Sequence, residues 1–376
     1  MGALCVAALL GGCGAVVDRL LNRVYEAPPY EVEAATQELY RRQLVVDLHG
    51  DILLWRRDLL ERAGHGHVDL PRLQEGNVAL QVFGVVTQVP FTFSLDNNKP
   101  TPDVISALAW SDDWPAETRD SRLERALYQA DKLADRIARS DGALTLVTDR
   151  AELEALIAAR RGGAPVIGAI LLLEGAQALD GELANIDRLY DAGFRIVGLS
   201  HLFDNDMAGS AHGTEKHGLT PQGRELVRRL QEKRMIIDLA HASPQAFDEV
   251  IAMARGPVIA SHGGVRGTCD TNRNLSDDQV RAIAGTGGLV GIGVYRYATC
   301  GKTVADTVRA MRHVADLVGV SHVALGSDFD GAVATVFDTT GWPLLVEALL
   351  ADGFSEAEIA AILGGNALRV LREALP

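Results

Sequence analysis

Short apolar runs alternate with longer segments of helical periodicity along most of this chain. The runs are rich in β-branched residues, and such an alternation is typical of βα units that build a parallel sheet. Eight runs occur, at Leu44–Leu48, Val78–Val86, Val166–Leu173, Arg195–Ser200, Met235–Ala240, Pro257–Ser261, Gly288–Val294 and His322–Ser327. Eight parallel strands with intervening helices predict an α/β protein with a closed (β/α)8 barrel of the TIM type.

The segments between the runs carry helix-start signals. Leu219–Arg234 opens with Thr220 and Pro221, a pair suited to an N-cap and a first helical turn. Ser276–Ile283 opens with Ser-Asp-Asp, and acidic residues are favoured in a first turn. Ser355–Leu375 predicts a closing helical tail that covers the barrel.

The stretch between the second and third runs is unusually long. From about Pro90 to Arg150 it holds a polar, turn-rich part at Asp96–Pro102 and then a charged amphipathic helix, roughly Ala116–Ser140. We expect this stretch to be an insertion over one mouth of the barrel. No repeat, linker or low-complexity segment indicates a second domain, so residues 31–376 are expected to form a single domain.

The first 30 residues have a different character from the rest. Met1–Val17 is small, apolar and uncharged, and Leu10-Gly11-Gly12-Cys13 resembles the lipobox at which bacterial lipoproteins are cleaved and lipidated. The positively charged start of an export signal is missing. Either a longer signal precedes this segment or the segment is a first buried helix. We favour export, to the periplasm or to a membrane through a lipid anchor at Cys13, over a cytoplasmic location.

Composition excludes one class of partner. The chain of 376 residues has 47% hydrophobic residues, enough for a large core, and a formal net charge of -14. Nucleic-acid binding needs clustered Lys and Arg, and no basic run occurs. We therefore expect no nucleic-acid partner.

Polar residues end six of the eight runs. In a parallel barrel the catalytic groups project from the carboxyl ends of the strands, so these positions are the candidates for chemistry. A lone histidine there is more often a core or capping residue, but four of the ten histidines of the chain occupy such ends. The strand-end residues are His49, Asp51, Glu174, His201, His241, His262 and Asp328.

Five of these residues form a plausible two-metal site. His49 and Asp51 are two apart on a strand and should share a face, and so one metal ion. Glu174 follows an apolar run, where an unpaired carboxylate is costly unless a cation compensates it. His241 and His262 end neighbouring runs and complete a second nitrogen and oxygen site suited to zinc.

Glu174 is also the only candidate for a bridge between the two ions. Many two-metal barrels use a carbamylated lysine, but no lysine of this chain ends a strand. The lysines are Lys99, Lys132, Lys216, Lys233 and Lys302. A water or hydroxide between the ions would then be the nucleophile, its pKa lowered by the metals.

Two further groups complete the candidate site. Asp328 could carry a proton from the water to a leaving nitrogen, with Asp330 as the competing candidate because it has the same-face spacing. Arg273 follows a strand-end histidine by a short loop and could bind a substrate carboxylate with two parallel hydrogen bonds. An exposed loop arginine taken alone is more often a surface residue.

Taken together, these motifs resemble those of the membrane dipeptidase family, also called renal dipeptidase, of the metal-dependent amidohydrolase superfamily. The match runs from about Leu44 to Leu371. It rests on Asp47-Leu-His-Gly-Asp51, Leu173-Glu-Gly175, Leu199-Ser-His201, Ile237-Asp-Leu-Ala-His-Ala-Ser243, Ser261-His262, Arg273-Asn274 and Gly326-Ser-Asp-Phe-Asp-Gly331. Two departures, Gly50 where Asn is frequent and Ala176 where a second glycine is usual, leave the metal ligands intact and concern only substrate preference.

The resemblance implies a role for each residue. His49, Asp51 and Glu174 would hold one zinc ion, and Glu174, His241 and His262 the other. The resemblance also favours Asp328 over Asp330 as the proton shuttle. His201 would polarise the scissile carbonyl and stabilise its oxyanion, and Arg273, with Tyr297 less clearly, would bind the C-terminal carboxylate of a dipeptide.

The implied reaction is hydrolysis of a dipeptide with a free C-terminal carboxylate, often with a D-residue at that end. We expect two Zn²⁺ per chain and a homodimer. The resemblance further implies a disulfide between Cys269 and Cys300, in the loops after the sixth and seventh strands, and with it an oxidising compartment. The alternative is a pair of reduced thiols in a cytosolic enzyme.

Two other functions stay open at this stage. Another two-metal amidohydrolase acting on N-acyl amino acids or lactones would share the fold, although Arg273 argues against most neutral substrates. A maturation protein without general dipeptidase activity could also keep every ligand.

Overall fold

Eight parallel strands close into a barrel in the computed structural model, which describes residues 14–376. They follow one another around the ring in the order β2-β1-β9-β8-β7-β6-β5-β4, and the pairing of β2 with β4 closes it. The strands are β1 Val45–Gly50, β2 Val78–Val86, β4 Ile167–Glu174, β5 Phe194–Gly198, β6 Ile236–Asp238, β7 Ile259–Ala260, β8 Leu289–Ile292 and β9 Val323–Leu325. The predicted (β/α)8 barrel is confirmed, and each of its strands overlaps a predicted run.

A further short strand, β3 Leu144–Leu146, was not predicted. It pairs in parallel with the beginning of β4, whereas β5 pairs with β4 only from Leu171 onward. β3 therefore extends the sheet beside the ring without being part of it. Its three residues lie inside the stretch that the sequence pattern assigned to an insertion.

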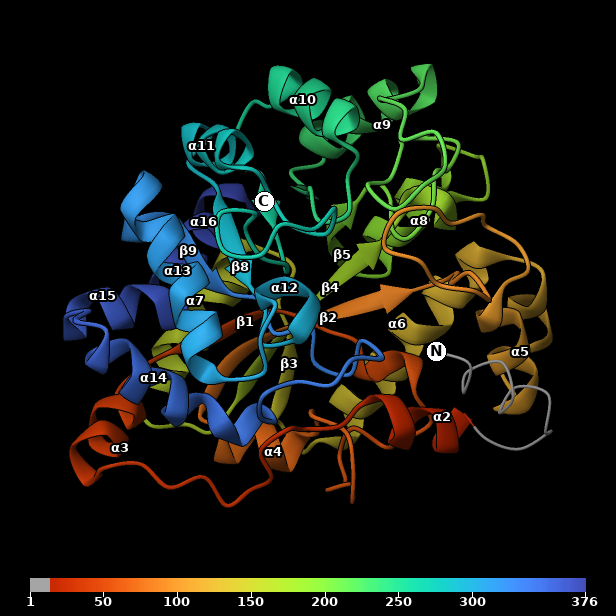
Figure 1. The fold of residues 1–376 in the computed structure, drawn as a ribbon. Coiled ribbons are helices and arrows are strands. Elements are labelled where there is room, and N and C mark those ends of the chain that lie inside the picture. The colour runs from red at the N-terminus through yellow and green to blue at the C-terminus, as the bar shows by residue number, and fades with distance from the viewer. Residues whose placement is uncertain (1–13) are drawn as a thin grey trace.

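Helices surround the barrel on its outside (Figure 1). They are α2 Gly14–Leu21, α3 Ala34–Arg41, α4 Leu70–Glu75, α5 Val104–Ser111, α6 Arg122–Arg139, α7 Arg150–Arg161, α8 Asn185–Asp191, α9 Pro221–Glu232, α10 Pro244–Met253, α11 Asp277–Gly285, α12 Arg296–Thr299, α13 Val304–Val318, α14 Trp342–Ala351, α15 Glu356–Ala360 and α16 Asn366–Ala374. Thr220 caps α9 by accepting a hydrogen bond from Gly223, and Ser276 forms a capping box with Gln279 at the start of α11. Both helix starts were predicted.

The region predicted as one long helix is divided. Residues 116–119 form a separate 3-10 turn, and α6 begins at Arg122 because the side chain of Ser121 caps it by accepting from the backbone of Glu124. α6 packs against β2 and β3 on the side of the barrel, and also against the turns at residues 52–54 and 176–179 that follow β1 and β4. The preceding loop reaches the mouth, where the Asn98 amide donates to the carbonyls of Leu202 and His212.

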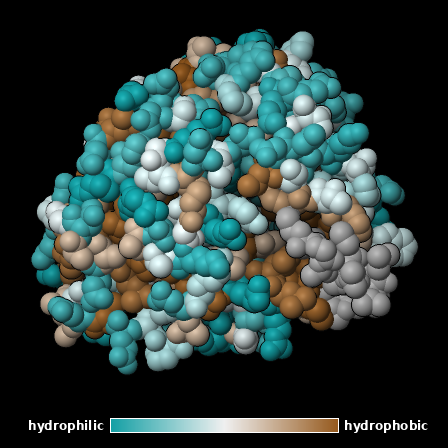
Figure 2. All heavy atoms as spheres, in the orientation of Figure 1, coloured by the Kyte–Doolittle hydropathy of each residue, from teal (hydrophilic) through white to brown (hydrophobic). Residues whose placement is uncertain are grey.

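The core has an inner and an outer part. Inside the barrel, strand residues such as Val46, Leu172 and Ile259 form one buried cluster. Leu368 and Leu371 of α16 belong to the same cluster, so the helical tail closes the amino end of the barrel, as predicted. The carboxyl ends of the strands are therefore the end left for chemistry. Polar side chains cover most of the surface seen in Figure 2.

The described part of the N-terminal segment packs against the barrel. Asp18 of α2 is buried and accepts hydrogen bonds from Asn22 Nδ2 at 2.8 Å and Arg57 Nε at 2.6 Å. Cys5, Cys13 and the lipobox-like sequence lie outside the described residues, so export and lipidation stay predictions. Among residues 14–376, no helix combines the length and apolar character that crossing a bilayer requires.

Candidate active site

The strand-end residues predicted from the sequence meet in one buried site at the carboxyl mouth of the barrel. Glu174 is the last residue of β4, and the other members lie at or just beyond the ends of their strands. The residues that gather there are His49, Asp51, Glu174, His201, His241, His262 and Asp328, and each is at most 8% exposed. Side chains from six strands of the barrel thus converge.

Glu174 lies at the centre of this group. Its Oε1 is 3.1 Å from His241 Nε2 and 3.3 Å from His262 Nε2. The same oxygen is 3.7 Å from His49 Nε2, and Oε2 is 3.4 Å from His201 Nε2. A carboxylate surrounded by four imidazole nitrogens is well placed to be shared between two cations.

Asp51 lies near His49 as predicted, but not because the two residues alternate along one strand. It lies beyond the end of β1, and the pairing of β1 with β2 shifts register between Asp47 and Gly50, so simple alternation does not orient it. Its Oδ2 nevertheless lies 3.3 Å from His49 Nε2. Gly84 of β2 makes room for the pair, because a Cβ there would collide with Asp51 Oδ1 and His49.

Three overlapping sets of side chains could each hold a metal ion. In each set the ligand atoms lie within 4.8 Å of one another. The sets are His49 with Glu174 and His262, Glu174 with His201 and His241, and His49 with Asp51 and Asp328. Every predicted ligand belongs to at least one set, and His201 and Asp328 are additional members.

The donor atoms themselves fit a divalent cation. Among the described residues, His49 Nε2 and Asp51 Oδ1 are buried without a hydrogen-bond partner. Orphaned buried polar atoms are costly unless another group satisfies them. A metal ion would do so, and a mixed set of imidazole and carboxylate ligands is the one that zinc accepts.

Burial and charge set the protonation of these ligands. Burial raises the pKa of Glu174 well above its usual range, and Asp51 adds to the rise. Burial lowers the pKa values of His241 and His262 well below the usual range, with Arg273 contributing, so both imidazoles are neutral at pH 7 and free to bind a metal ion. Burial also opposes charge on His49, but Asp51 and Glu174 outweigh it and raise the pKa of His49 to about 10. The carboxylates therefore attract positive charge, which a metal ion would supply.

His262 is oriented by two residues that sequence reasoning missed. Its Nδ1 donates to Ser261 Oγ at 2.8 Å, and that hydroxyl donates to Asp238 Oδ2 at 2.5 Å. This chain fixes the tautomer and directs the Nε2 lone pair toward Glu174. Both residues stand inside the quoted sequence motifs, but nothing in their spacing shows that they contact each other.

His212 was also missed. It is fully buried, its Nδ1 lies 2.7 Å from the Leu95 carbonyl, and its Nε2 has no partner. Its ring centroid lies 5.2 Å from that of His241, whose Nδ1 is also without a partner. Burial, with Arg273 contributing, lowers the pKa of His212 to about 4, so it is a neutral neighbour of the metal ligands.

The loop after β9 separates the roles of Asp328 and Asp330. Burial raises the pKa of Asp328 to about 7, with Asp51 adding to the rise, and its carboxylate faces the metal-ligand group. Asp330 instead accepts hydrogen bonds from the backbones of His67 at 2.8 Å and Val68 at 3.1 Å. It also pairs with Arg57 Nη2 at 2.8 Å. Asp330 is therefore fully engaged in holding the loop.

Arg273 lies next to the metal ligands, with its Nη2 donating to the His262 carbonyl at 2.9 Å. Tyr295, which the sequence did not indicate, is buried beside both Arg273 and Asp328, and burial raises the pKa of its phenol. Its hydroxyl forms no well-aligned hydrogen bond to either group. Tyr297, the predicted carboxylate contact, is 39% exposed, and its ring faces Phe93 at 6.5 Å between centroids.

A disulfide joins Cys269 to Cys300, with their Cα atoms 5.3 Å apart. The pairing agrees with the one expected from the family resemblance. Arg273 lies within the loop that the bond closes, so the bond ties this loop to the one after β8.

These features agree with a comparison against known families. A family model described as membrane dipeptidase (peptidase family M19) matches residues 33–375. The chain belongs to the membrane dipeptidase family. Its fold and clustered ligands are accordingly those of a metallopeptidase.

Two relatives within the family are named dipeptidases. Dipeptidase 3 of Macaca fascicularis is 29% identical over 326 residues, which are 82% of this chain and 64% of that protein. Dipeptidase aclJ of Aspergillus oryzae is 27% identical over 356 residues, which are 89% of this chain and 79% of that protein. The chain thus spans somewhat less than two thirds of the first relative.

Solved structures of other proteins have a similar architecture. A metallo peptidase from Rhodobacter sphaeroides, bound to a phosphinate mimic of the dipeptide L-Ala-D-Ala, is 25% identical with a TM-score of 0.71, covering 89% of this chain and 99% of that one. The probable dipeptidase PvdM from Pseudomonas aeruginosa, at 21% identity, has the same fold with a TM-score of 0.76, covering 91% of this chain and 98% of that one.

Proposed function

We propose that this protein is a zinc-dependent dipeptidase that cleaves dipeptides with a free C-terminal carboxylate, including dipeptides that end in a D-residue. The observation that carries the proposal is the buried Glu174 carboxylate, surrounded by four imidazoles beside Arg273. Membership of the family supports it, as does the R. sphaeroides relative with its L-Ala-D-Ala mimic.

The metal centre would hold two ions in the arrangement expected from the sequence. His49 and Asp51 would bind one ion, His241 and His262 the other, and Glu174 would bridge them. Two divalent cations there would polarise the scissile carbonyl and lower the pKa of a water molecule. The distances support this assignment, because Glu174 Oε1 lies within 3.7 Å of the Nε2 atoms of His49, His241 and His262, and Asp51 Oδ2 lies 3.3 Å from His49 Nε2.

The remaining residues would position the substrate and move protons. Arg273 would hold the terminal carboxylate, and His201, neutral because burial lowers its pKa well below the usual range, would donate an N–H to the carbonyl oxygen as it becomes negative. Asp328, whose pKa is raised to about 7, can take up and release a proton near neutral pH and would pass it to the leaving amine.

The alternatives from the sequence lose support. A lactone has no free carboxylate for Arg273 to bind, and the named relatives quoted above are dipeptidases. An N-acyl amino acid keeps the carboxylate and stays the closest competing substrate. The homodimer, the lipid anchor at Cys13 and an oxidising compartment remain predictions.

A substrate panel tests the proposal. We expect the zinc-loaded protein to hydrolyse L,L and L,D dipeptides and to act far less well on N-acyl amino acids, amidated dipeptides and lactones. A preference for N-acyl amino acids over every dipeptide would contradict it.

Arg273→Met tests the role of the guanidinium. The variant should lose about 2–3 kcal/mol of transition-state binding for free-carboxylate dipeptides, the value of a charge-assisted hydrogen-bonded pair. Its metal content should stay that of the wild type because the hydrogen bond from Arg273 to His262 goes to the main-chain carbonyl and not to the imidazole ring. Steady-state kinetics and metal analysis measure the two effects, and unchanged kcat/KM would remove Arg273 from the site.

A further inference from the structure

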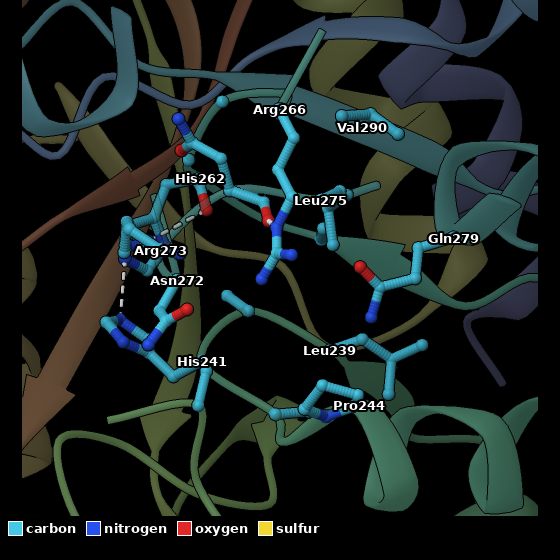
Figure 3. A pocket seen from close by; sticks show the side chains of 18 of the residues that line it. Leu239, His241, Pro244, His262, Arg266, Asn272, Arg273, Leu275, Gln279 and Val290 are labelled. Carbon is cyan, nitrogen blue, oxygen red and sulfur yellow. Dashed lines mark hydrogen bonds between the residues drawn. The ribbon is translucent and has the colours of Figure 1, made fainter. Parts of the chain in front are cut away.

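A small cavity lies directly beside the metal ligands (Figure 3). His241, His262 and Arg273 line one end of it, and Leu239 and Pro244 form part of its wall. Its volume is about 60 Å³. That is room for roughly four water molecules, or for a side chain of four or five heavy atoms.

The charged side chains that line the cavity are all cationic. Figure 3 shows the guanidinium of Arg266 pointing into the space between Arg273 and Gln279. Arg266, Lys216 and Arg273 all line the cavity, and no Asp or Glu does. This is unusual in a chain whose net charge is -14.

Each of the three cations donates a hydrogen bond to a main-chain carbonyl. Arg266 Nε donates to Asn274 at 3.2 Å, Lys216 Nζ to Asp96 at 2.6 Å and Arg273 Nη2 to His262 at 2.9 Å. Within residues 14–376, none of the three forms an ion pair with a carboxylate inside 4.0 Å. Cations that line one cavity and have no carboxylate within ion-pair distance favour an anionic ligand there.

We propose that this cavity receives the side chain of the C-terminal residue of the dipeptide and selects an acidic one, aspartate or glutamate. The inference rests on the proposed dipeptidase function and names its substrate class. Arg273 takes the main-chain carboxylate, and the guanidinium of Arg266 takes the carboxylate of the side chain, with Lys216 adding positive charge to the cavity lining. The methylene groups lie against Leu239 and Pro244, and the small volume excludes an aromatic side chain.

Gln279 contributes polarity at the far end of the cavity. Its side-chain oxygen accepts from the backbone of Ser276 at 2.9 Å, which orients the amide and leaves its NH2 group as a donor. A second donor beside Arg266 suits a carboxylate, which accepts several hydrogen bonds, better than it suits an amide side chain.

The test compares kcat/KM for alanyl dipeptides ending in Asp, Asn, Glu, Gln or Ala, in both stereochemical forms, with the zinc-loaded wild type, Arg266→Gln and Arg281→Gln. Arg281 is an exposed arginine of α11 paired only with Asp278, so it is the matched control. We expect the wild type to prefer Asp over Asn, and Glu over Gln, by at least tenfold. Arg266→Gln should reduce these ratios to near one, chiefly through KM for the acidic substrates, and Arg281→Gln should leave them unchanged.

Calorimetric binding of free aspartate and asparagine to the same three proteins separates this inference from the proposed function. If no dipeptide is cleaved but aspartate binds more tightly than asparagine in an Arg266-dependent way, the dipeptidase assignment fails and the acidic pocket stands. Efficient cleavage with no preference for acidic ends, or a preference that survives Arg266→Gln, overturns the pocket and leaves the dipeptidase intact. Loss of metal from Arg266→Gln would also overturn it, since Arg266 would then act on the metal site.

Discussion

Three imidazole nitrogens lie within 3.7 Å of a single carboxylate oxygen of Glu174. Hydrogen bonding among neutral groups does not explain this crowding. The high pKa of Glu174 shows the cost of placing this carboxylate there without a cation. The same side chain follows an apolar run in the sequence, which is why its role could be predicted. A buried carboxylate crowded by several imidazoles is a strong sign of a metal site.

Glu174→Gln should lose metal and activity together, because an amide is neutral and a poorer ligand for both ions. Metal analysis and dipeptide hydrolysis of the same preparation check this. Glu232→Gln, at an exposed position at the end of α9, is the matched control and should behave as the wild type. Full metal content in Glu174→Gln would show that the bridge is wrongly assigned.

The groups that support the ligands were much harder to predict than the ligands. Asp238 and Ser261 lie 23 positions apart and meet only because β6 and β7 are neighbours in the barrel. His212 comes from a loop whose path no local pattern specifies, whereas Tyr295 directly follows the seventh predicted run and was passed over. Strand-end position identifies a residue that faces the mouth, but contacts between loops depend on the tertiary structure.

At the scale of elements, the turn after β9 carries two aspartates, Asp328 and Asp330, whose side chains have different surroundings. Asp328 and Asp330 both have positive φ angles, of 63° and 62°, so the chain turns sharply twice. One carboxylate faces the ligands, and the other is held by Arg57 and by two backbone amides. Sequence spacing alone could not separate them, whereas their hydrogen-bond partners do.

Asp328→Asn and Asp330→Asn form a matched pair, since asparagine tolerates the left-handed conformation at both positions. Asp328→Asn should lower kcat by about 10²–10⁴-fold with little loss of stability, because a proton carrier is removed. Asp330→Asn should lower the free energy of unfolding by about 3 kcal/mol, because Arg57 is left buried with one partner fewer. Kinetics and denaturant unfolding measure both. The reverse outcome would exchange the two roles.

Asp330 also predicts how stability depends on pH. Burial alone would raise its pKa, but Arg57 and His67 outweigh burial and hold the pKa below the usual range. The group therefore stabilises the fold fully above its unfolded pKa of about 3.9, and this contribution is lost as the pH falls through the lower folded pKa. In acid unfolding, Asp330→Asn should lack this part of the pH dependence, while Asp328→Asn should retain it.

The Cys269–Cys300 disulfide joins the loops after β7 and β8 at the same mouth of the barrel. Its cysteines are 31 positions apart, and closing a loop of that size is worth about 3–4 kcal/mol in the chain-entropy model. Replacing both cysteines with serine should lower the free energy of unfolding by about that amount. It should also raise KM, because the Arg273 loop is no longer tied down. Equal KM would show that the loop is held by its other contacts.

For the whole molecule, the alternation of apolar runs and helices was sufficient to predict the barrel because each run had to become a buried parallel strand. The pattern could not predict the structure of the segment between β2 and β4. In that segment β3 is only three residues long and α6 packs on the side of the barrel. Short strands are fixed by the neighbour that they pair with, and that information is absent from their own residues.

Metal removal should affect the whole protein. The clustered carboxylates lose their counter-charge, so the chelated protein should melt at a lower temperature, and adding zinc at about 1,000 times its Kd should restore about 4 kcal/mol per site. Calorimetry with and without chelator measures this effect. An unchanged melting temperature would indicate that the predicted sites do not bind metal in the folded state.

Both ends of the described chain are anchored, and this limits where the protein can be trimmed or extended. Arg57 forms ion pairs with both Asp18 and Asp330. A chain shortened to begin at residue 31 would therefore remove one ion-pair partner of the arginine that holds the turn after β9. At the other end, the Pro376 carbonyl accepts from Arg150 and the Leu375 side chain is fully buried. A protein engineer who treats the first 30 residues as a dispensable leader, or fuses a tag directly to the last one, would therefore disturb the barrel at its two opposite mouths.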